Sequence, residues 1–445
     1  MNPDVVKRYA APVPRYTSYP TAPHFTAAIG PEDYARWLAA LPSGASLSIY
    51  AHIPFCNQLC WYCGCTTKAT RRYKPVADYV TALLEEIATI SSLLPLGCRT
   101  EHVHWGGGSP SILQPDDIRQ LADAISGSFN RTPEAEFAVE VDPRHIDAER
   151  VAAFAESGVN RVSIGVQDFD PAVQKAINRA QSVAMTRAAV EMFRDAGVPS
   201  INIDLVYGLP HQSRDGVERT IEEVIALAPD RIALFGYAHL PARLPHQRLI
   251  PDDSLPGVTE RFAQANRAAN LLIAAGYRRI GLDHFARPDD PLATGPLHRN
   301  FQGYTTDAAD ALLGLGASSI GKLPQGYVQN CTATAEYQRQ VRAGSLATVK
   351  GRALTEEDRA RSLVIERLMC DLAFPAEELK QHFPSIAAPL IAEARAVIEG
   401  DADGLVTPDG DGFRVTEKGR LFLRPLCACF DAYLGQGQAR HSVGV

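Results

Sequence analysis

Four of the nine cysteines, Cys56, Cys60, Cys63 and Cys65, lie within ten residues and follow an apolar run. Cysteines this close would form strained disulfides, whereas thiolates from one loop can converge on a common metal centre. A closed zinc site needs a second ligand pair, and no later stretch offers Cys-x2-Cys or two histidines at a comparable spacing. Three ligands from one loop therefore favour an iron–sulfur cluster with one iron open to a small molecule, and zinc or structural thiols remain the alternatives.

Short apolar segments alternate with amphipathic ones in the middle of the chain, and this pattern predicts the frame that positions the cysteines. Buried strands are predicted at residues 47–55, 102–105, 137–141, 161–166, 201–207 and 231–237. Helices are predicted at residues 76–94, 115–129, 147–156, 183–196, 216–228 and 258–275. Strand–helix units with short connections indicate an α/β fold with a partial β/α barrel, in which chemistry collects beyond the carboxyl ends of the strands.

Polar or glycine-rich residues follow several predicted strands. The run from Gly106 to Pro110 allows backbone groups to approach a ligand closely, although a simple tight turn has the same composition. Glu140 ends the third strand, where a carboxylate can accept both hydroxyls of a ribose or form a surface ion pair. Asp204 lies inside an apolar strand, and a purely structural role would require a partner that the sequence does not reveal. The barrel rim is therefore the expected ligand site.

Two later stretches, residues 281–288 and 297–305, are polar, aromatic and loop-like. Together with His239, their histidines and aromatic side chains indicate a pocket for a flat ligand with a polar rim. Guanidinium groups bind carboxylates bidentately, so nearby arginines are candidate ligands for acidic substituents. Those candidates are Arg243, Arg287 and Arg299.

The two ends of the chain differ from its middle. Residues 1–30 are rich in Pro, Tyr and Thr without a helical or strand period, which predicts an irregular arm rather than a packed element. After about residue 336 the pattern predicts helices, with Thr355 capping one of them, and a small hairpin near residues 404–416. We expect three parts: an arm and leading helix at residues 1–45, a barrel at 46–335, and a mostly helical, winged-helix-like domain at 336–445. Cys427 and Cys429 have no nearby partners and are read as ordinary thiols.

Composition excludes several classes of function. The net charge is −7, without a basic block, and this argues against nucleic acid as the main partner. The sequence has no apolar run long enough for a transmembrane span and no apolar leader, so we expect a cytoplasmic protein. The odd number of cysteines agrees with reduced thiols.

The motif Cys56-x3-Cys60-x2-Cys63 resembles the cluster-binding signature of radical S-adenosylmethionine enzymes. The longer stretch from Tyr50 to Cys65 resembles that of the oxygen-independent coproporphyrinogen III oxidases. Pro14-Arg15-Tyr16-Thr17-Ser18-Tyr19-Pro20-Thr21 is similar to the arm of that family, which related heme-handling members of the superfamily generally lack. The stretches that contain His284 and His298 are also near matches to segments of the family.

The resemblance implies a [4Fe–4S] cluster on Cys56, Cys60 and Cys63, two S-adenosylmethionine sites, and a 5'-deoxyadenosyl radical. The radical would convert two propionates of coproporphyrinogen III to vinyl groups and give protoporphyrinogen IX for heme biosynthesis. The first S-adenosylmethionine would contact Tyr50, Gly107, Glu140, Ala238 and Ile320. The second would contact Tyr62, Gly108, Ser109, Gln167, Arg179 and Asp204. Substrate closure is the hypothesis for Arg15, Tyr16, Ser18 and Tyr19, and a structural strap is its alternative.

The resemblance leaves other functions open. One alternative is a heme-binding chaperone of the same superfamily without decarboxylase activity, and another is a radical enzyme that acts on a different tetrapyrrole or transfers methyl groups. For the oxidase we expect a monomer that needs an electron donor for the cluster and an unidentified electron acceptor.

Overall fold

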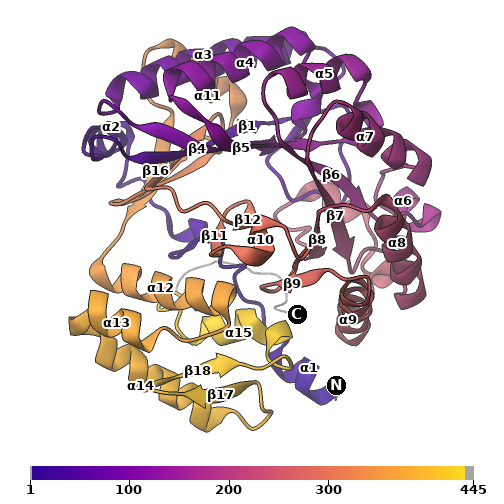
Figure 1. Cartoon of the computed structure of the whole chain (residues 1–445), viewed down its shortest axis with the longest axis vertical. Coiled ribbons are helices and arrows are strands. Elements are labelled where there is room, and N and C mark those ends of the chain that lie inside the picture. The colour runs from indigo at the N-terminus through magenta and orange to yellow at the C-terminus, as the bar shows by residue number, and fades with distance from the viewer. Residues whose placement is uncertain (1–2, 436–445) are drawn as a thin grey trace.

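The computed structural model describes residues 3–435, and a single large sheet dominates it (Figure 1). Its strand order is β16-β15-β14-β13-β1-β4-β5-β6-β7-β8-β10-β9. From β13 to β8 neighbouring strands run parallel, and the strands beyond them at both edges are antiparallel. The two edge strands, β16 and β9, do not pair, so the barrel is partial, as the sequence predicts. The parallel strands are β13 (Ala311–Leu315), β1 (Ser46–Ile53), β4 (Arg99–Gly107), β5 (Arg131–Val141), β6 (Arg161–Gln167), β7 (Ser200–Tyr207) and β8 (Arg231–Gly236).

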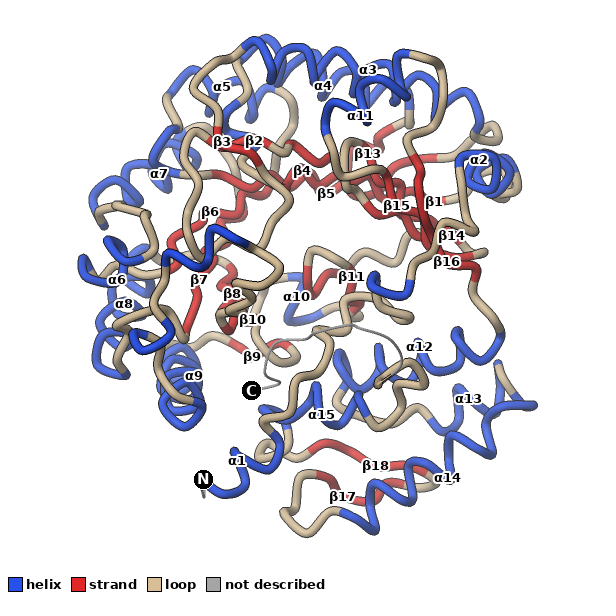
Figure 2. Tube along the Cα trace, turned by 180° about the vertical axis from the view of Figure 1, so that it is seen from behind, coloured by secondary structure: helices blue, strands red, loops and turns tan. Residues whose placement is uncertain are grey.

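Helices cover the outer face of this sheet (Figures 1 and 2). They are α3 (Lys74–Leu93), α4 (Pro115–Ser128), α5 (Ala148–Glu156), α6 (Pro171–Ala176), α7 (Val183–Asp195), α8 (Arg214–Leu227) and α9 (Val258–Ala274). All six strands and six helices predicted from periodicity are present. Two strands start several residues earlier than predicted, β4 at Arg99 and β5 at Arg131.

Side chains alternate along the parallel strands, and this alternation separates the core from the site. In β4, Val103 and Trp105 are buried in the apolar core. Their neighbours His102 and His104 line a cavity on the opposite face. Because successive residues of a strand point to opposite faces, the concave face of the sheet becomes polar while the convex face packs against helices.

The sheet continues beyond the predicted end of the barrel. The strands β14 (Ile320–Leu323), β15 (Gly326–Asn330) and β16 (Thr348–Ala353) extend one edge. The helix α11 (Thr334–Arg342) lies between the last two in sequence and packs on α3. Since β16 pairs with β15 along its length, we propose that the barrel ends near residue 353 rather than 335.

The C-terminal part forms a separate layer below the barrel in Figure 1. It contains α12 (Glu356–Asp371), α13 (Ala376–His382), α14 (Pro384–Gly400), the hairpin of β17 (Val406–Asp409) and β18 (Gly412–Val415), and α15 (Leu423–Ala428). Thr355 caps α12 through a capping box, as predicted. The predicted hairpin is also present.

The N-terminal arm corrects one prediction, because it is packed rather than irregular throughout. It begins with α1 (Pro3–Tyr9), whose Val5 and Val6 are buried against Phe262 and Phe422. The predicted leading helix is α2 (Pro31–Ala39). The outermost parts of the predicted first and last segments, residues 1–2 and 436–445, lie outside the described residues.

The two aromatic stretches are also more regular than loops. They contain β10 (His284–Ala286), β11 (His298–Asn300) and β12 (Gly303–Thr305), and β9 (Arg278–Ile280) precedes them. The helix α10 (Pro291–Thr294) lies between β10 and β11. Among residues 3–435, none of the helices combines the length and apolarity needed to cross a bilayer.

Candidate active site

The cysteine loop leaves the carboxyl end of β1. There β2 (Phe55–Cys56) pairs with β3 (Lys68–Ala69), and the Thr70 amide donates to the Cys56 carbonyl at 2.9 Å. This pairing closes residues 57–67 into a compact loop at the carboxyl end of β1 (Figure 2). Cys60 is buried, Cys56 and Cys63 are half-buried, and Cys65 is exposed. The three cysteines of the motif are therefore presented together from one loop.

Two guanidinium groups lie against the cysteines. Arg144 and Arg179 each donate to the Cys60 Sγ at 3.5 Å, and Asp142 lies between them, 2.6 Å from Arg144 and 3.5 Å from Arg179. Within the described residues, the buried Arg144 Nη1 and Arg179 Nε have no hydrogen-bond partner. Thiolates and bridging sulfides are anionic, so these unused donors fit a [4Fe–4S] cluster on the three cysteines.

The thiols themselves are not equivalent. Burial raises the pKa of the Cys56 thiol to about 12, whereas the hydrogen bond with Cys65 lowers the pKa of Cys63 to about 7. Across residues 3–435 no three His, Cys, Asp or Glu side chains converge on one point as ligands of a single metal ion would. The irons of a cluster occupy separate corners, so cluster cysteines need not converge in that way.

The glycine run after β4 leaves space for a carboxylate and an imidazole. A Cβ on Gly106 would lie 2.6 Å from Glu140 Oε1, and one on Gly107, whose φ is +111°, would lie 2.5 Å from the His52 ring. The Gly107 amide donates to Glu140 Oε2 at 3.2 Å, and His104 contacts Oε1 at 3.2 Å. Tyr50 stacks on His104 with 5.9 Å between ring centroids. The fold thus gathers Tyr50, Gly107 and Glu140, three residues predicted for the first S-adenosylmethionine.

The remaining two residues of that set lie further along the rim. Gln247 Nε2 bridges the Ala238 carbonyl at 3.2 Å and the Tyr62 carbonyl at 3.0 Å. Ile320 begins β14, next to Gly314, which is the register partner of Tyr50.

The residues predicted for the second S-adenosylmethionine form a neighbouring group. The Ser109 hydroxyl accepts from the Asp142 amide at 3.2 Å, and the Gly108 amide donates to the Ile53 carbonyl at 2.9 Å. Arg179 donates to the Gly165 carbonyl at 2.6 Å, and a Cβ on Gly165 would lie 2.8 Å from Gln167 Nε2.

Asp204 completes this group, as the register partner of Gly165. It accepts from Ser163 at 2.8 Å and from Asn202 at 2.7 Å, which are the partners that the sequence did not reveal. Burial raises the pKa of Asp204.

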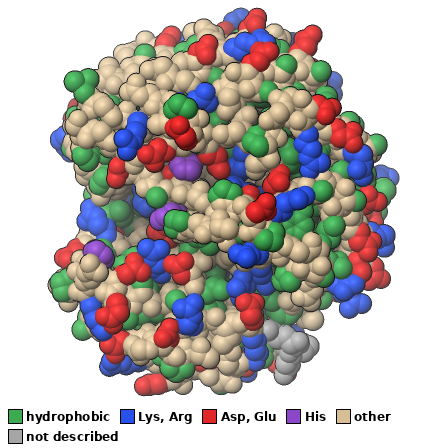
Figure 3. Space-filling view, viewed as in Figure 1, with side chains coloured by type: hydrophobic (Ala, Val, Ile, Leu, Met, Phe, Trp, Pro, Cys, Tyr) green, Lys and Arg blue, Asp and Glu red, His purple; other side chains and the backbone are tan. Residues whose placement is uncertain are grey.

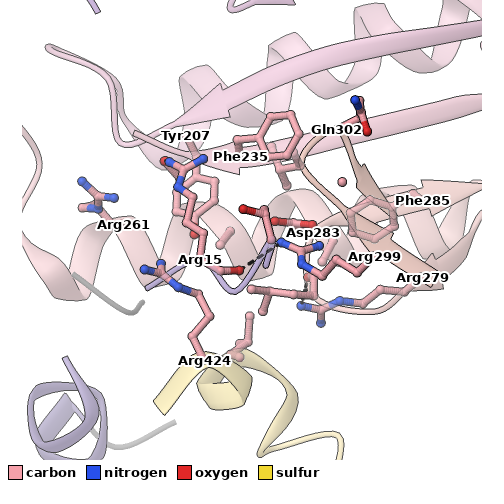
Figure 4. A pocket seen from close by; sticks show the side chains of 18 of the residues that line it. Arg15, Tyr207, Phe235, Arg261, Arg279, Asp283, Phe285, Arg299, Gln302 and Arg424 are labelled. Carbon is pink, nitrogen blue, oxygen red and sulfur yellow. Dashed lines mark hydrogen bonds between the residues drawn. The ribbon is translucent and has the colours of Figure 1, made fainter. Parts of the chain in front are cut away.

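A cavity of about 410 Å³ opens between the barrel and the C-terminal layer (Figure 4). Figure 3 shows charged side chains of both signs and histidines along the furrow between these two parts. Arginines from the arm, α9, β9, β11 and α15 line the cavity, and the only acid among its lining residues is Asp283. These arginines are Arg15, Arg261, Arg279, Arg299 and Arg424.

The charges in this arginine cavity are not balanced. Within the described residues, the buried Arg261 Nε, Arg279 Nε and Arg299 Nη1 have no hydrogen-bond partner. Burial, assisted by neighbouring arginines, lowers the pKa of Arg279 and of Arg424 to about 10. Burial alone would raise the pKa of Asp283, but His284, Arg299 and Arg15 hold it at about 2. The cavity therefore offers donors and positive charge to an anionic ligand.

A second, smaller cavity of about 120 Å³ lies on the concave face of the sheet and shares Phe235 and Gln302 with the first. The two arginines that line it are paired with acids. Arg161 donates to Glu136 at 2.8 Å, and Arg231 lies 3.4 Å from Glu136 and donates to both Asp290 oxygens at 2.9 Å. We call this four-residue network the barrel floor.

The arm crosses the arginine cavity and is fixed at several points. Arg15 donates to the Gly236 carbonyl at 2.9 Å, and Arg299 donates to the carbonyls of Arg15 and Tyr16 at 3.3 Å. Tyr16 donates to Asp431 at 3.0 Å, and the Ala432 amide donates to the Tyr19 hydroxyl at 2.9 Å. Arg424 donates to the carbonyls of Val13 and Pro14.

Comparison with known proteins agrees with this geometry. Residues 50–224 match the Radical SAM superfamily, and residues 354–422 match the HemN C-terminal domain. A relative from Bradyrhizobium diazoefficiens, named oxygen-independent coproporphyrinogen III oxidase, is 47% identical over 437 residues that cover 97% of each chain. The solved coproporphyrinogen III oxidase of Escherichia coli, described as a radical SAM enzyme, is 39% identical, with a TM-score of 0.90 over 97% of this chain and 99% of that one.

The chain belongs to the oxygen-independent coproporphyrinogen III oxidase family. Radical SAM enzymes use a [4Fe–4S] cluster and S-adenosylmethionine, and these are the cofactors predicted for the cysteine loop and the rim. The assignment of individual residues to the two S-adenosylmethionine sites stays a prediction.

The structure bears on three groups of residues predicted to contact the substrate: the arginines, the histidines and the arm. Of the three arginines proposed for acidic substituents, only Arg299 lines the cavity. Arg287 instead donates to the carbonyls of Ala228 and Pro229, at the amino-terminal end of β8. Arg243 is exposed on the loop after β8 and does not line the cavity.

The structure does not bring the three predicted histidines into one pocket. His284 lines the smaller cavity, His298 lies 3.0 Å from Glu366, and His239 lies 2.8 Å from Asp252. In the arm, Arg15 lines the arginine cavity with Thr17, whereas Tyr16 and Tyr19 are buried anchors; Ser18 is half-buried.

The sequence reasoning missed Arg144, Arg261, Arg279 and Arg424. These arginines come from four separate elements, so no spacing connects them. One usable signal was present for Arg261, because it lies among the apolar positions of an otherwise amphipathic helix.

Proposed function

We propose that this protein catalyses the oxygen-independent oxidative decarboxylation of two propionate side chains of coproporphyrinogen III, giving protoporphyrinogen IX in heme biosynthesis. The relatives that carry this name match nearly the whole chain. The observation that carries the proposal is the arginine cavity beside the cysteine loop, because Cys65 of that loop lines the same cavity as the five arginines.

The chain's residues bind and orient the substrate. Each pyrrole ring of coproporphyrinogen carries a propionate, and guanidinium groups bind carboxylates through paired N–H donors. Arg261, Arg279 and Arg299 contribute the buried donors that lack a partner in the described residues. Phe235 and Phe285 supply apolar surface for the macrocycle in the same cavity.

The cluster and S-adenosylmethionine, when bound, supply a 5'-deoxyadenosyl radical that removes a hydrogen atom from the β-carbon of a propionate. Carbon dioxide and one electron then leave, and a vinyl group remains. A primary alkyl radical reacts with almost any C–H bond, so the reaction requires a closed site without water. The arm, held across the cavity by Arg299 and by residues 424–432, provides that closure.

The alternative of a heme-binding chaperone is less well supported. Histidine is a common axial ligand of heme iron, and the residues that line the arginine cavity do not include one. The curated relatives at high identity carry the name of the oxidase.

The proposal includes the setting of the reaction. We place the protein in the cytoplasm, because its nine cysteines are free, as is usual in a reducing compartment. We keep the expectation of a monomer that takes electrons from a separate donor and passes the substrate electron to an acceptor not yet identified.

An anaerobic assay tests the proposal. The iron-reconstituted protein is incubated with S-adenosylmethionine, a reductant, coproporphyrinogen III and a cell extract as the source of acceptor, and porphyrins and deoxyadenosine are measured together. We expect protoporphyrin with matching deoxyadenosine, both lost in Cys56→Ser and retained in Cys429→Ser, which changes an exposed thiol far from the loop in sequence. Deoxyadenosine without protoporphyrin would reject the substrate, and tight heme binding without either product would favour the chaperone.

A further inference from the structure

The cysteine loop and two segments that contact it are rich in exposed bases, although the whole chain has a net charge of −7 and acids follow these segments at Asp78 and Asp252. The loop and its flanks, residues 57–77, contain no acidic residue, and neither do residues 171–190 and 231–251, which contact the loop. We call the exposed bases of these three segments the basic face. They are Lys68, Arg71, Arg72, Lys74, Lys175, Arg243 and Arg248, and Lys74 pairs with Asp78 at 2.8 Å.

Hydrogen bonds hold the three segments of the basic face side by side. Gln58 donates to the Asn178 side chain at 2.8 Å, and the Trp61 amide donates to the Ile177 carbonyl at 3.0 Å. His246 contacts the Cys63 carbonyl at 2.7 Å. The surface is therefore preformed rather than assembled on binding.

A shallow, open depression lies at the centre of this surface. Asn57, Trp61, Arg71 and Asn178 are among its lining residues, together with Leu249, which is 56% exposed. An apolar centre inside a polar rim is the usual composition of a protein-docking surface. This depression shares no lining residue with the arginine cavity, so a partner there leaves the substrate site clear.

Several residues that line the depression are direct neighbours of the cysteines. Asn57 and Trp61 directly follow Cys56 and Cys60 in sequence, and the backbone of Thr70, another lining residue, bonds to the Cys56 carbonyl. A group bound in the depression thus lies next to the cluster ligands without entering the arginine cavity.

We propose that the basic face is the docking surface for a small acidic protein that delivers single electrons to the cluster. The inference rests on the proposed function, because it requires the cluster at Cys56, Cys60 and Cys63. In each encounter the carrier's reduced cofactor loses one electron and the cluster gains it, with no bond formed or broken. Interfaces of redox partners are small and transient, and complementary charge mainly accelerates their association.

The test uses charge reversal on the reconstituted protein. Arg71→Glu/Arg72→Glu changes the basic face, and Lys175→Glu/Arg248→Glu changes it at positions outside the cysteine loop. The matched control is Arg99→Glu/Arg194→Glu, which makes the same change in charge at exposed positions where β4 begins and α7 ends, toward the amino-terminal ends of the parallel strands.

The probe is a flavodoxin of strongly negative net charge, reduced to its hydroquinone. Stopped-flow absorbance follows cluster reduction, and calorimetry measures the Kd of the oxidised flavodoxin. At low salt we expect both basic-face variants to slow flavodoxin-dependent reduction by about tenfold or more and to weaken binding, because charge steering controls association. Dithionite, a small reductant, should reduce the clusters of all variants at the wild-type rate, and the control should match wild type with both reductants.

The docking inference would be overturned if flavodoxin reduced the cluster equally fast in wild type and in both basic-face variants. It would also be overturned if the control variant lost as much flavodoxin-dependent rate as the basic-face variants. Loss of dithionite reduction in both basic-face variants would also overturn it, because the substitutions would then act on the cluster itself. The proposed function fails separately, if wild-type protein reduced by dithionite forms deoxyadenosine but no protoporphyrin.

Discussion

The barrel floor and the arginine cavity of this protein treat charge in opposite ways. In the barrel floor, Arg161 and Arg231 face Glu136 and Asp290, so two bases meet two acids. Among the described residues that line the arginine cavity, five are arginines and one, Asp283, is acidic. Charge that is balanced within the chain stabilises the fold, whereas charge left unbalanced in a cavity is available to a ligand. The difference separates the structural network from the substrate site without reference to relatives.

The largest expected effect is on the barrel floor. Glu136→Gln leaves Arg161 and Arg231 without their shared carboxylate. Because Glu136 is half-buried and Arg231 keeps Asp290, we expect a loss of about 2–3 kcal/mol, less than the cost of breaking a fully buried pair. Urea unfolding of the cluster-free protein measures the free energy of unfolding. The control is Glu134→Gln, the same substitution at an exposed position of the same strand. A loss below about 1 kcal/mol in Glu136→Gln would show that the network does not support the fold.

In the arginine cavity we expect a substitution to weaken substrate binding and to leave the stability of the fold almost unchanged. Arg279→Met removes a buried base whose pKa is lowered by burial and by Arg420, so the free energy of unfolding should change by less than about 1 kcal/mol. Loss of a buried charge partner for a propionate should cost about 2 kcal/mol of binding, which raises KM about 30-fold. The neighbouring exposed Arg278→Met is the control. An unchanged KM together with a large loss of stability would assign Arg279 to the fold instead.

Acid should affect the barrel floor selectively. Burial by itself raises the pKa of Glu136, but Arg161 and Arg231 outweigh burial and hold it at about 2, against a usual 4.5. Because the folded pKa is depressed, the stabilisation is present above pH 4.5 and is lost as the pH falls toward 2. The expected loss from this group is about 2–3 kcal/mol, and Glu136→Gln should flatten that part of the pH profile of unfolding. An unchanged profile in the variant would contradict the assignment.

The smallest expected effect concerns the arm. Tyr16→Phe removes the hydrogen bond to Asp431 and should cost about 1 kcal/mol of stability, with faster proteolysis near residue 16. Tyr73→Phe, which removes a hydrogen bond to Asp117 far from the arm, is the control for a general loss of stability. Deletion of residues 1–21 with full turnover would reject a role of the arm in substrate closure.

The sequence predicted the barrel well because local patterns determine it. Apolar residues at alternate positions, such as Ile201 and Ile203 in β7, identify a strand, and the same alternation places Asn202 and Asp204 on the polar face. The cysteine motif was equally local.

What the sequence did not reveal depends on contacts between distant segments. Arg261, Arg279 and Arg424 acquire a common role only when α9, β9 and α15 meet, and Arg287 appeared equivalent to them by composition. The helix α1 is too short for a clear period, and Val5 and Val6 become core residues only against Phe262 and Phe422. Tertiary packing decided these cases.

The hydrogen bonds between the arm and α15 have a consequence for the synthesis of the protein. Arg424 bonds to the carbonyls of Val13 and Pro14, residues about 410 positions earlier in the chain. A ribosome adds about 5–20 residues per second, so about 20–80 s separate the synthesis of the two partners. For most of that interval the residues of the cysteine loop have been synthesised while the arm has no α15 to hold it across the cavity.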